Sequence, residues 1–172
     1  MRPALLLLAA ALTACGAAAM EAYDLRTRPG GSPSAWRLEM TNNFVGGPGL
    51  EVNAVRTDSG GHTRYALEIT YTGDAWLAIP DGGSIELLLD GVTRSIQGPG
   101  SAGNRHVLPD GRVREMAVYP VSAEHLRAIA DARAGRVRVP GVPIPRERKL
   151  EDVHLQRFRE FVARAVEPPS VR

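Results

Sequence analysis

The only cysteine of this chain, Cys15, lies where a short apolar leader ends. The leader carries one positive charge, Arg2, and has no polar side chain from residue 4 to residue 12. A lone cysteine can be a small buried hydrophobe or a free thiol, but neither role explains its place directly after such a leader. A positive start, a short apolar run and small residues at its end are typical of a secretory signal rather than a membrane-spanning helix.

The residues at the end of the leader, Leu12-Thr13-Ala14-Cys15, resemble the lipobox of bacterial lipoproteins, in which an aliphatic residue and two small ones precede an obligatory cysteine. The resemblance implies cleavage between Ala14 and Cys15, diacylglycerol on the Cys15 sulfur and acylation of the new amino terminus. It covers residues 1–16 only and implies nothing about the fold of the remaining chain.

The resemblance also bears on localisation, because lipoprotein sorting is read from the residues just after the lipidated cysteine. Here those residues are Gly16 and Ala17, with no aspartate as a retention signal. In an organism with two membranes, the resemblance therefore implies transfer to the outer membrane, with the domain facing the periplasm. Two or more acyl chains make release from the bilayer negligible, so the domain would stay within the reach of its tether.

Composition limits the classes of protein and partner. The chain has 172 residues and a net charge of +2 at pH 7, and without the leader its length fits one domain that needs no disulfide. No arginine cluster has the interleaved aromatic residues suited to nucleic acid, which we exclude as a partner. Residues 122–172 are the more basic part. They could lie against anionic lipid or polysaccharide, although such an imbalance is typical of solvated helix faces.

Residues 98–103 read G-P-G-S-A-G, which fits the spacing of a dinucleotide-binding glycine motif. That chemistry needs a helix to begin inside the motif, so that its amino terminus can hold a pyrophosphate. The residues that follow, 104–111, are rich in loop formers instead, so we interpret the segment as a flexible loop. Ser101 within it lacks the first glycine of the G-x-S-x-G nucleophile motif, because Pro99 stands at that position.

Histidines are the other candidate acid–base or metal-ligating groups. They are His62, His106, His125 and His154. No two have the i, i+4 spacing of a helical metal pair, and no thiol remains to join them. We interpret all four as solvated side chains. A site assembled from distant loops, such as His62 with Asp58 or His106 with Asp110, stays open.

Period-two alternation of apolar and polar residues predicts strands along most of the chain. The expected strands are 36–40, 50–57, 63–72, 75–79, 84–89, 92–97, 113–121 and 136–139. Turn formers at 58–62 and at Asp90-Gly91 join neighbouring strands as hairpins. Asp81 and Asp110 also precede glycines and are explained by the same turn chemistry. Short strands spaced by such turns predict antiparallel sheets over a shared core.

Two helices are expected in the C-terminal third. Ser122 can cap the first, at 122–134, with Leu126 and Ile129 facing inward. The second ends at Pro168 and carries a continuous apolar stripe. The residues of this stripe are Leu155, Phe158, Phe161, Val162 and Ala165. It could dock a partner helix, but covering the chain's own sheet is the simpler use. Residues 140–149, rich in Pro and Arg, are expected to form a surface connection.

These elements predict an α+β, mainly β fold: an antiparallel β-sandwich or barrel-like sheet with two helices in the C-terminal third. The expected organisation is a signal peptide at 1–14, the lipidated cysteine with its tether and loop at 15–35, one β-rich domain at 36–166 and a disordered tail at 167–172.

No motif points to a catalytic residue, a cofactor or a metal. We therefore expect a lipid-anchored cell-envelope protein that acts as a non-enzymatic binding or structural module, held to the membrane by its lipid and binding an envelope protein or polysaccharide. The alternative is a small envelope hydrolase with a site built from loops. A deep pocket with converging titratable groups would favour the enzyme, and flat edges or an exposed apolar patch would favour binding.

Overall fold

The structure is a computed structural model that describes residues 22–32, 34–47 and 49–167. The predicted leader, the cleavage and lipidation sites at Ala14 and Cys15, and residues 168–172 of the predicted tail lie outside the described residues.

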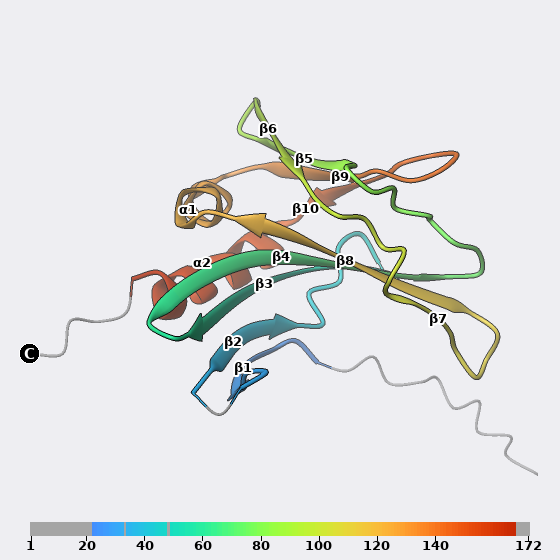
Figure 1. The fold of residues 1–172 in the computed structure, drawn as a ribbon. Coiled ribbons are helices and arrows are strands. Elements are labelled where there is room, and N and C mark those ends of the chain that lie inside the picture. Colours follow the sequence, from blue (N-terminus) through green and yellow to red (C-terminus); the bar gives the residue numbers. More distant parts are fainter. Residues whose placement is uncertain (1–21, 33, 48, 168–172) are drawn as a thin grey trace, which may run out of the picture.

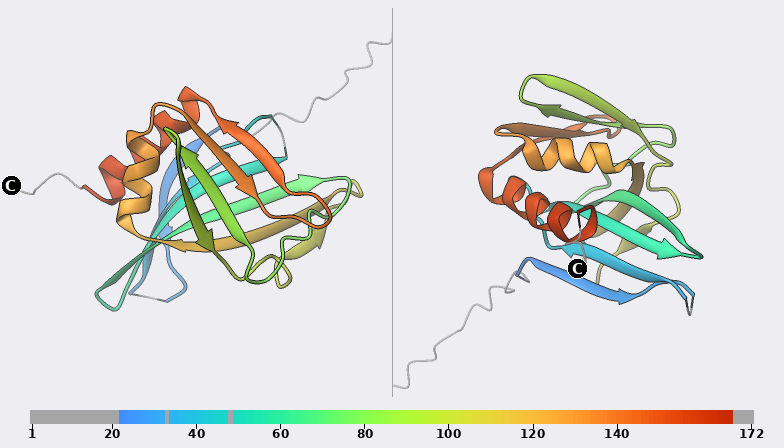
Figure 2. Two further views of the ribbon diagram at one scale, coloured as in Figure 1. Left: turned by 90° about the horizontal axis from the view of Figure 1, so that it is seen from above. Right: turned by 90° about the vertical axis from the view of Figure 1, so that its left-hand side faces the viewer.

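Two antiparallel sheets face each other, and two helices lie side by side at one end of them (Figures 1 and 2). The six-stranded sheet has the order β1 (Asp24–Pro29), β2 (Trp36–Thr41), β3 (Leu50–Ser59), β4 (His62–Gly73), β8 (Val113–Val121) and β7 (Arg105–Val107). The four-stranded sheet has the order β10 (Arg146–Leu150), β9 (Gly135–Val139), β5 (Ser84–Leu89) and β6 (Val92–Gln97). The helices are α1 (Ala123–Asp131) and α2 (Asp152–Ala165). The mainly β fold with two C-terminal helices is confirmed, as a sandwich and not as a closed barrel.

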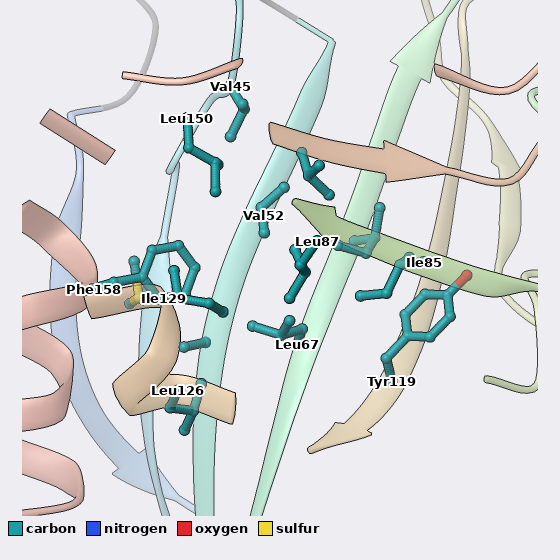
Figure 3. Close-up of a cluster of buried hydrophobic side chains, with 14 of the residues drawn as sticks. Val45, Val52, Leu67, Ile85, Leu87, Tyr119, Leu126, Ile129, Leu150 and Phe158 are labelled. Atoms are coloured by element: carbon teal, nitrogen blue, oxygen red, sulfur yellow. The ribbon is translucent and has the colours of Figure 1, made fainter. Parts of the chain in front are cut away.

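One hydrophobic core fills the space between the sheets and under the helices (Figure 3). Alternation along the strands supplies it, because Leu67 and Ile69 of β4 face the same side as Tyr119 of β8, and all three are fully buried. The helices add Leu126 and Phe158, which are also fully buried. The predicted use of the α2 stripe is therefore confirmed: it covers the chain's own sheets.

Turn chemistry places the hairpins where the sequence predicts them. The β3–β4 turn is Gly60-Gly61, and the β5–β6 turn is Asp90-Gly91 with φ of 48° and 87°. Two positive φ values match a turn that follows the twist of the strands. The Asp90 carboxylate also accepts hydrogen bonds from the backbone N–H groups of Arg133 and Ala134, which ties this hairpin to the end of α1.

Three strands lie in segments that the sequence predicted to be loops. β1 lies within the predicted tether and loop at 15–35, β7 within the glycine-rich loop, and β10 within the predicted connection at 140–149. Each is an edge strand with one neighbour. An edge strand does not need the alternating apolar pattern of a central one and tolerates proline and charge. This explains why periodicity missed all three.

The opposite error occurs at residues 75–79, which are not a strand. Ala78 has a φ of 55°, and the backbone N–H groups of Leu77, Ala78 and Ile79 bind the carboxylate of Glu115 instead of a neighbouring strand. Apolar composition here reflects burial beneath a loop, because Leu77 and Ile79 both belong to the core. The helix ends also differ slightly, since α1 ends at Asp131 and α2 at Ala165, each before the expected residue.

Candidate functional site

The outward face of the six-stranded sheet is polar and hollowed into a groove of about 320 Å³. Successive side chains of a strand point to opposite faces, so the residues next to the apolar, core-facing ones face outward. Register brings outward side chains of neighbouring strands together, because Arg26 stands opposite Glu39, and Thr70 stands between Glu51 and Met116. The groove is lined by Arg26, Arg28, Glu39, Met40, Thr41, Asn42, Glu51, Asn53, Glu68, Thr70, Arg114 and Met116.

One end of this groove is an ion-pair network around Glu39. The carboxylate is 3 % exposed and contacts three guanidinium groups: Arg28 Nη2 at 2.8 Å, Arg26 Nε at 3.2 Å and Arg37 Nε. Arg37 also donates through Nη2 to Glu68 at 2.6 Å. Burial alone would raise the pKa of Glu39, but the hydrogen bond and charge of Arg37, with smaller contributions from Arg26 and Arg28, outweigh it and hold this pKa below its ordinary value.

The rest of the groove keeps hydrogen-bonding capacity free. Glu51 is 9 % exposed, and within the described chain the only hydrogen bond to its carboxylate comes from Asn53 Nδ2 to Oε2 at 3.1 Å. Arg114, on the far side of Thr70, is exposed, and its guanidinium makes no ion pair or hydrogen bond with the described residues. A strong acceptor and a strong donor therefore face the same groove without pairing with each other.

This arrangement suits the binding of a hydrophilic molecule better than nucleophilic chemistry. The lining offers carboxylate, amide, hydroxyl and guanidinium groups, but no histidine, serine or cysteine. Nucleophilic catalysis needs a nucleophile beside a base, and general acid–base catalysis needs a carboxyl group that exchanges a proton near the working pH. The Glu39 carboxylate is paired with three guanidinium groups, which keep it charged.

A second polar cluster lies inside the fold around Glu115, a residue that the sequence interpretation did not single out. Glu115 is fully buried on β8 and accepts hydrogen bonds from the N–H groups of Leu77, Ala78 and Ile79 and from the Ser101 hydroxyl. This cluster fixes the loops at 74–80 and 98–104 against the sheet. Its signal was present in the sequence, because alternation places Glu115 on the same face as the apolar Ala117 and Tyr119.

The glycine motif at 98–103 serves this loop packing. A Cβ on Gly98 would lie 2.5 Å from the ring of Tyr119, and Gly100 has a φ of 74° and packs against the backbone of Pro80. Ser101 is fully buried against Glu115 and is therefore no exposed nucleophile. No helix follows the motif, so the interpretation as a loop is confirmed. The short strand β7 follows instead, and packing against Tyr119 and Pro80 fixes the conformation of the loop.

The histidines do not converge. His62 and His106 are exposed, at the start of β4 and in β7, while His125 pairs with Ser122 in the cap of α1. Neither proposed histidine–aspartate pair forms: Asp58 binds Arg56 and Thr63, and Asp110 binds Arg112. The interpretation as solvated is wrong for His154.

His154 is buried, with 6 % exposure, because α2 packs it beneath the segment that holds Phe44. Its Nδ1 accepts from the backbone N–H of Glu151 at 2.8 Å, so Nε2 carries the proton and donates to the Phe44 carbonyl oxygen at 2.7 Å. Burial lowers the pKa of His154, and the charge of Arg157 lowers it further. The neutral ring of His154 therefore links the start of α2 to the loop that contains Phe44.

Among the described residues, no group of three or more histidine, cysteine, aspartate or glutamate side chains could hold a metal ion. Within the same residues, neither helix combines the length and apolar composition needed to cross a bilayer. Comparisons with known protein families, curated proteins and solved structures find no match to this chain. The groove on the six-stranded sheet is therefore the candidate site on geometric grounds alone.

Proposed function

We propose that this protein is a lipid-anchored binding module of the bacterial cell envelope, whose groove on the outward face of the six-stranded sheet holds a hydrophilic glycan segment. The anchor rests on the lipobox resemblance at residues 12–15, and the absence of an aspartate after Cys15 supports the outer membrane, facing the periplasm. The observation that carries the binding role is the groove, in which the Glu51 carboxylate keeps acceptor capacity and the Arg114 guanidinium has no partner among the described residues.

A glycan fits this groove better than a folded protein partner. Sugar hydroxyls both donate and accept, so separate hydroxyls of one ligand can bind the Glu51 carboxylate and the Arg114 guanidinium. The core of a protein–protein interface is commonly apolar and rich in aromatic residues, whereas the large apolar residues of this lining are only Met116 and Met40, and Met40 belongs to the hydrophobic core. The volume of about 320 Å³ is at the lower end for a small-molecule site.

The register also sets the size of the ligand. Glu51 and Arg114 are two strands apart and offset by two residues along the strand direction, which separates their Cα atoms by about 12 Å. Both residues line the groove. A ligand of one or two sugar units therefore spans them, and a longer chain would continue along the groove towards Arg28.

Calorimetry with soluble envelope glycans tests the binding role. The probes are disaccharide fragments of peptidoglycan and the oligosaccharide part of lipopolysaccharide. We expect one probe to bind the wild-type protein, and Glu51→Gln with Arg114→Ala to weaken binding at least tenfold. The matched control is Glu147→Gln with Arg136→Ala, which removes an exposed ion pair from the other sheet. Absence of binding, or equal loss in both variants, would contradict the proposed site.

Cell fractionation with labelled fatty acid tests the anchor. We expect the wild-type protein in the membrane fraction with label, and Cys15→Ser as an unprocessed or soluble form without it. Equal label in wild type and variant would reject the lipobox assignment.

A further inference from the structure

The end of the sandwich opposite the helices gathers exposed apolar side chains. This end, called the loop end here, is formed by the loops at 74–83, 108–112 and 140–145 and lies on the right in Figure 1. It carries Trp76, Val107, Val142 and Ile144, which are 38 %, 69 %, 59 % and 70 % exposed. These four make up half of the exposed large hydrophobic residues among the described residues.

Contacts between the loops hold these side chains at one end. The Val142 N–H donates to the Leu77 carbonyl oxygen, next to Trp76, so the 140–145 loop packs on the 74–79 segment. Trp76 in turn lies 5.9 Å from the Arg105 guanidinium of β7, the strand that carries Val107. The four exposed apolar side chains are therefore held by loops that contact one another.

The described chain begins nearer to the loop end than to the end of the sheet at Trp36 and Asp58. Asn42 Nδ2 donates to the Ala22 carbonyl oxygen, and Asp24 stands opposite Thr41 in β1–β2. The loop that follows Thr41 runs to Gly49, whose carbonyl oxygen accepts from the Thr72 N–H. Thr72 lies at the end of β4, just before the 74–83 loop. Because Asn43 in turn accepts from the Val52 N–H near the start of β3, Ala22 leaves the fold in the half of the six-stranded sheet nearer the loop end.

The length of the tether limits how far this end can be from a bilayer. If Cys15 carries lipid, residues 15–21 join the membrane to Ala22, and seven extended residues span at most about 25 Å. The longest strand, β4, has 12 residues, so the sandwich is about 40 Å long. An upright domain therefore turns its loop end to the membrane, and the apolar residues there meet lipid instead of water.

We propose that the loop end is a membrane-contact surface, with Trp76, Val107, Val142 and Ile144 in the interfacial region of the bilayer that holds the anchor. This inference rests on the proposed lipid anchor. Tryptophan and aliphatic side chains gain from leaving water at a bilayer surface, and Arg105 beside Trp76 can remain among the headgroups. The contact leaves the groove, which lies on a sheet face, open to the side.

The two tryptophans of the chain allow a direct test. Trp36 lies at the opposite end of the sheet, where it stands across from Asp58, and it is 38 % exposed, the same as Trp76. The chain from Cys15 to Arg172, which contains every described element, is coupled through its single cysteine to a maleimide lipid in vesicles with brominated acyl chains. Bromine quenches tryptophan only on close approach. Trp36→Phe leaves Trp76 as the reporter, and Trp76→Phe leaves Trp36.

We expect quenching of Trp76 to exceed that of Trp36 by about twofold or more, since only the former meets lipid. Ile144→Asp should reduce the quenching of Trp76, whereas Val92→Asp, at another exposed position in the β5–β6 hairpin, should not. Equal quenching of both tryptophans, quenching of neither, or dimerisation of the uncoupled chain that Ile144→Asp abolishes would overturn the proposal. The lipid is attached chemically, so these results do not depend on whether cells lipidate Cys15.

Discussion

Replacing Glu115 with glutamine should loosen the loops that the buried carboxylate holds. In the wild type, Oε1 accepts from the N–H groups of Leu77 and Ala78, and Oε2 accepts from Ile79 N–H and the Ser101 hydroxyl. Glutamine keeps one oxygen and presents an NH₂ group in place of the other. The Ser101 hydroxyl can turn to accept from this group, because its oxygen also lies 3.3 Å from the Ile79 carbonyl oxygen. The Ile79 N–H cannot adapt.

The free energy of unfolding should therefore fall by about 1–4 kcal/mol. An unsatisfied buried N–H costs about 1–3 kcal/mol. Loss of the Arg105 contact, 3.5 Å from Oε2 and partly exposed on the arginine side, adds at most about 1 kcal/mol. A domain of this size has about 5–15 kcal/mol in total, so the change is large but leaves the variant folded.

Urea denaturation followed by circular dichroism measures this change. The control is Glu124→Gln, whose side chain is 79 % exposed and should alter the free energy of unfolding by less than about 0.5 kcal/mol. In a Trp36→Phe background, Trp76 fluorescence should also shift to longer wavelength in Glu115→Gln, because residue 76 adjoins the released loop. A Glu115→Gln midpoint equal to that of Glu124→Gln would refute the assignment of Glu115 as the group that fixes these loops.

Phe158→Ala should lower the free energy of unfolding by about 3–5 kcal/mol, measured in urea, because the ring is fully buried under both sheets; an unchanged midpoint would contradict this packing. The pKa of His154 is lowered by burial, so the unfolded chain takes up a proton below about pH 6.5 that the folded one does not, and stability should fall from pH 7.5 to 5.5. His154→Gln should show a smaller fall over that range, and an identical pH dependence would show that His154 does not cause it. Tyr119→Phe removes a buried hydroxyl that has no partner among the described groups, so it should stabilise the fold or leave it unchanged; a loss above about 1 kcal/mol would reveal an interaction of that hydroxyl.

The sequence predicted the parts of the fold that local pattern determines. Alternation identified the central strands, such as β4, and Asp90-Gly91 and Ser122 marked a turn and a helix start. The edge strands were missed because a strand with one neighbour has no need of an alternating pattern. Residues 75–79 were mistaken for a strand because burial under a loop and burial in a sheet select the same apolar residues.

The groove could not be predicted, because it depends on register between strands far apart in the sequence. Glu51 and Arg114 look like ordinary outward positions until β3, β4 and β8 are aligned. Glu115 could have been found, since a carboxylate on the inward face of a strand requires buried donors. The burial of His154 could not, because its partner Phe44 lies 110 residues away.

The intact mass of the protein extracted from bacterial membranes tests the central claim, lipid anchorage of this domain, most directly. The proposal predicts a chain that begins at Cys15 and carries a diacylglycerol thioether and an acylated amino terminus. That mass should be lost in Cys15→Ser, while the far-UV circular dichroism of the domain stays unchanged. A soluble chain without lipid, or one that retains residues 1–14, would contradict it.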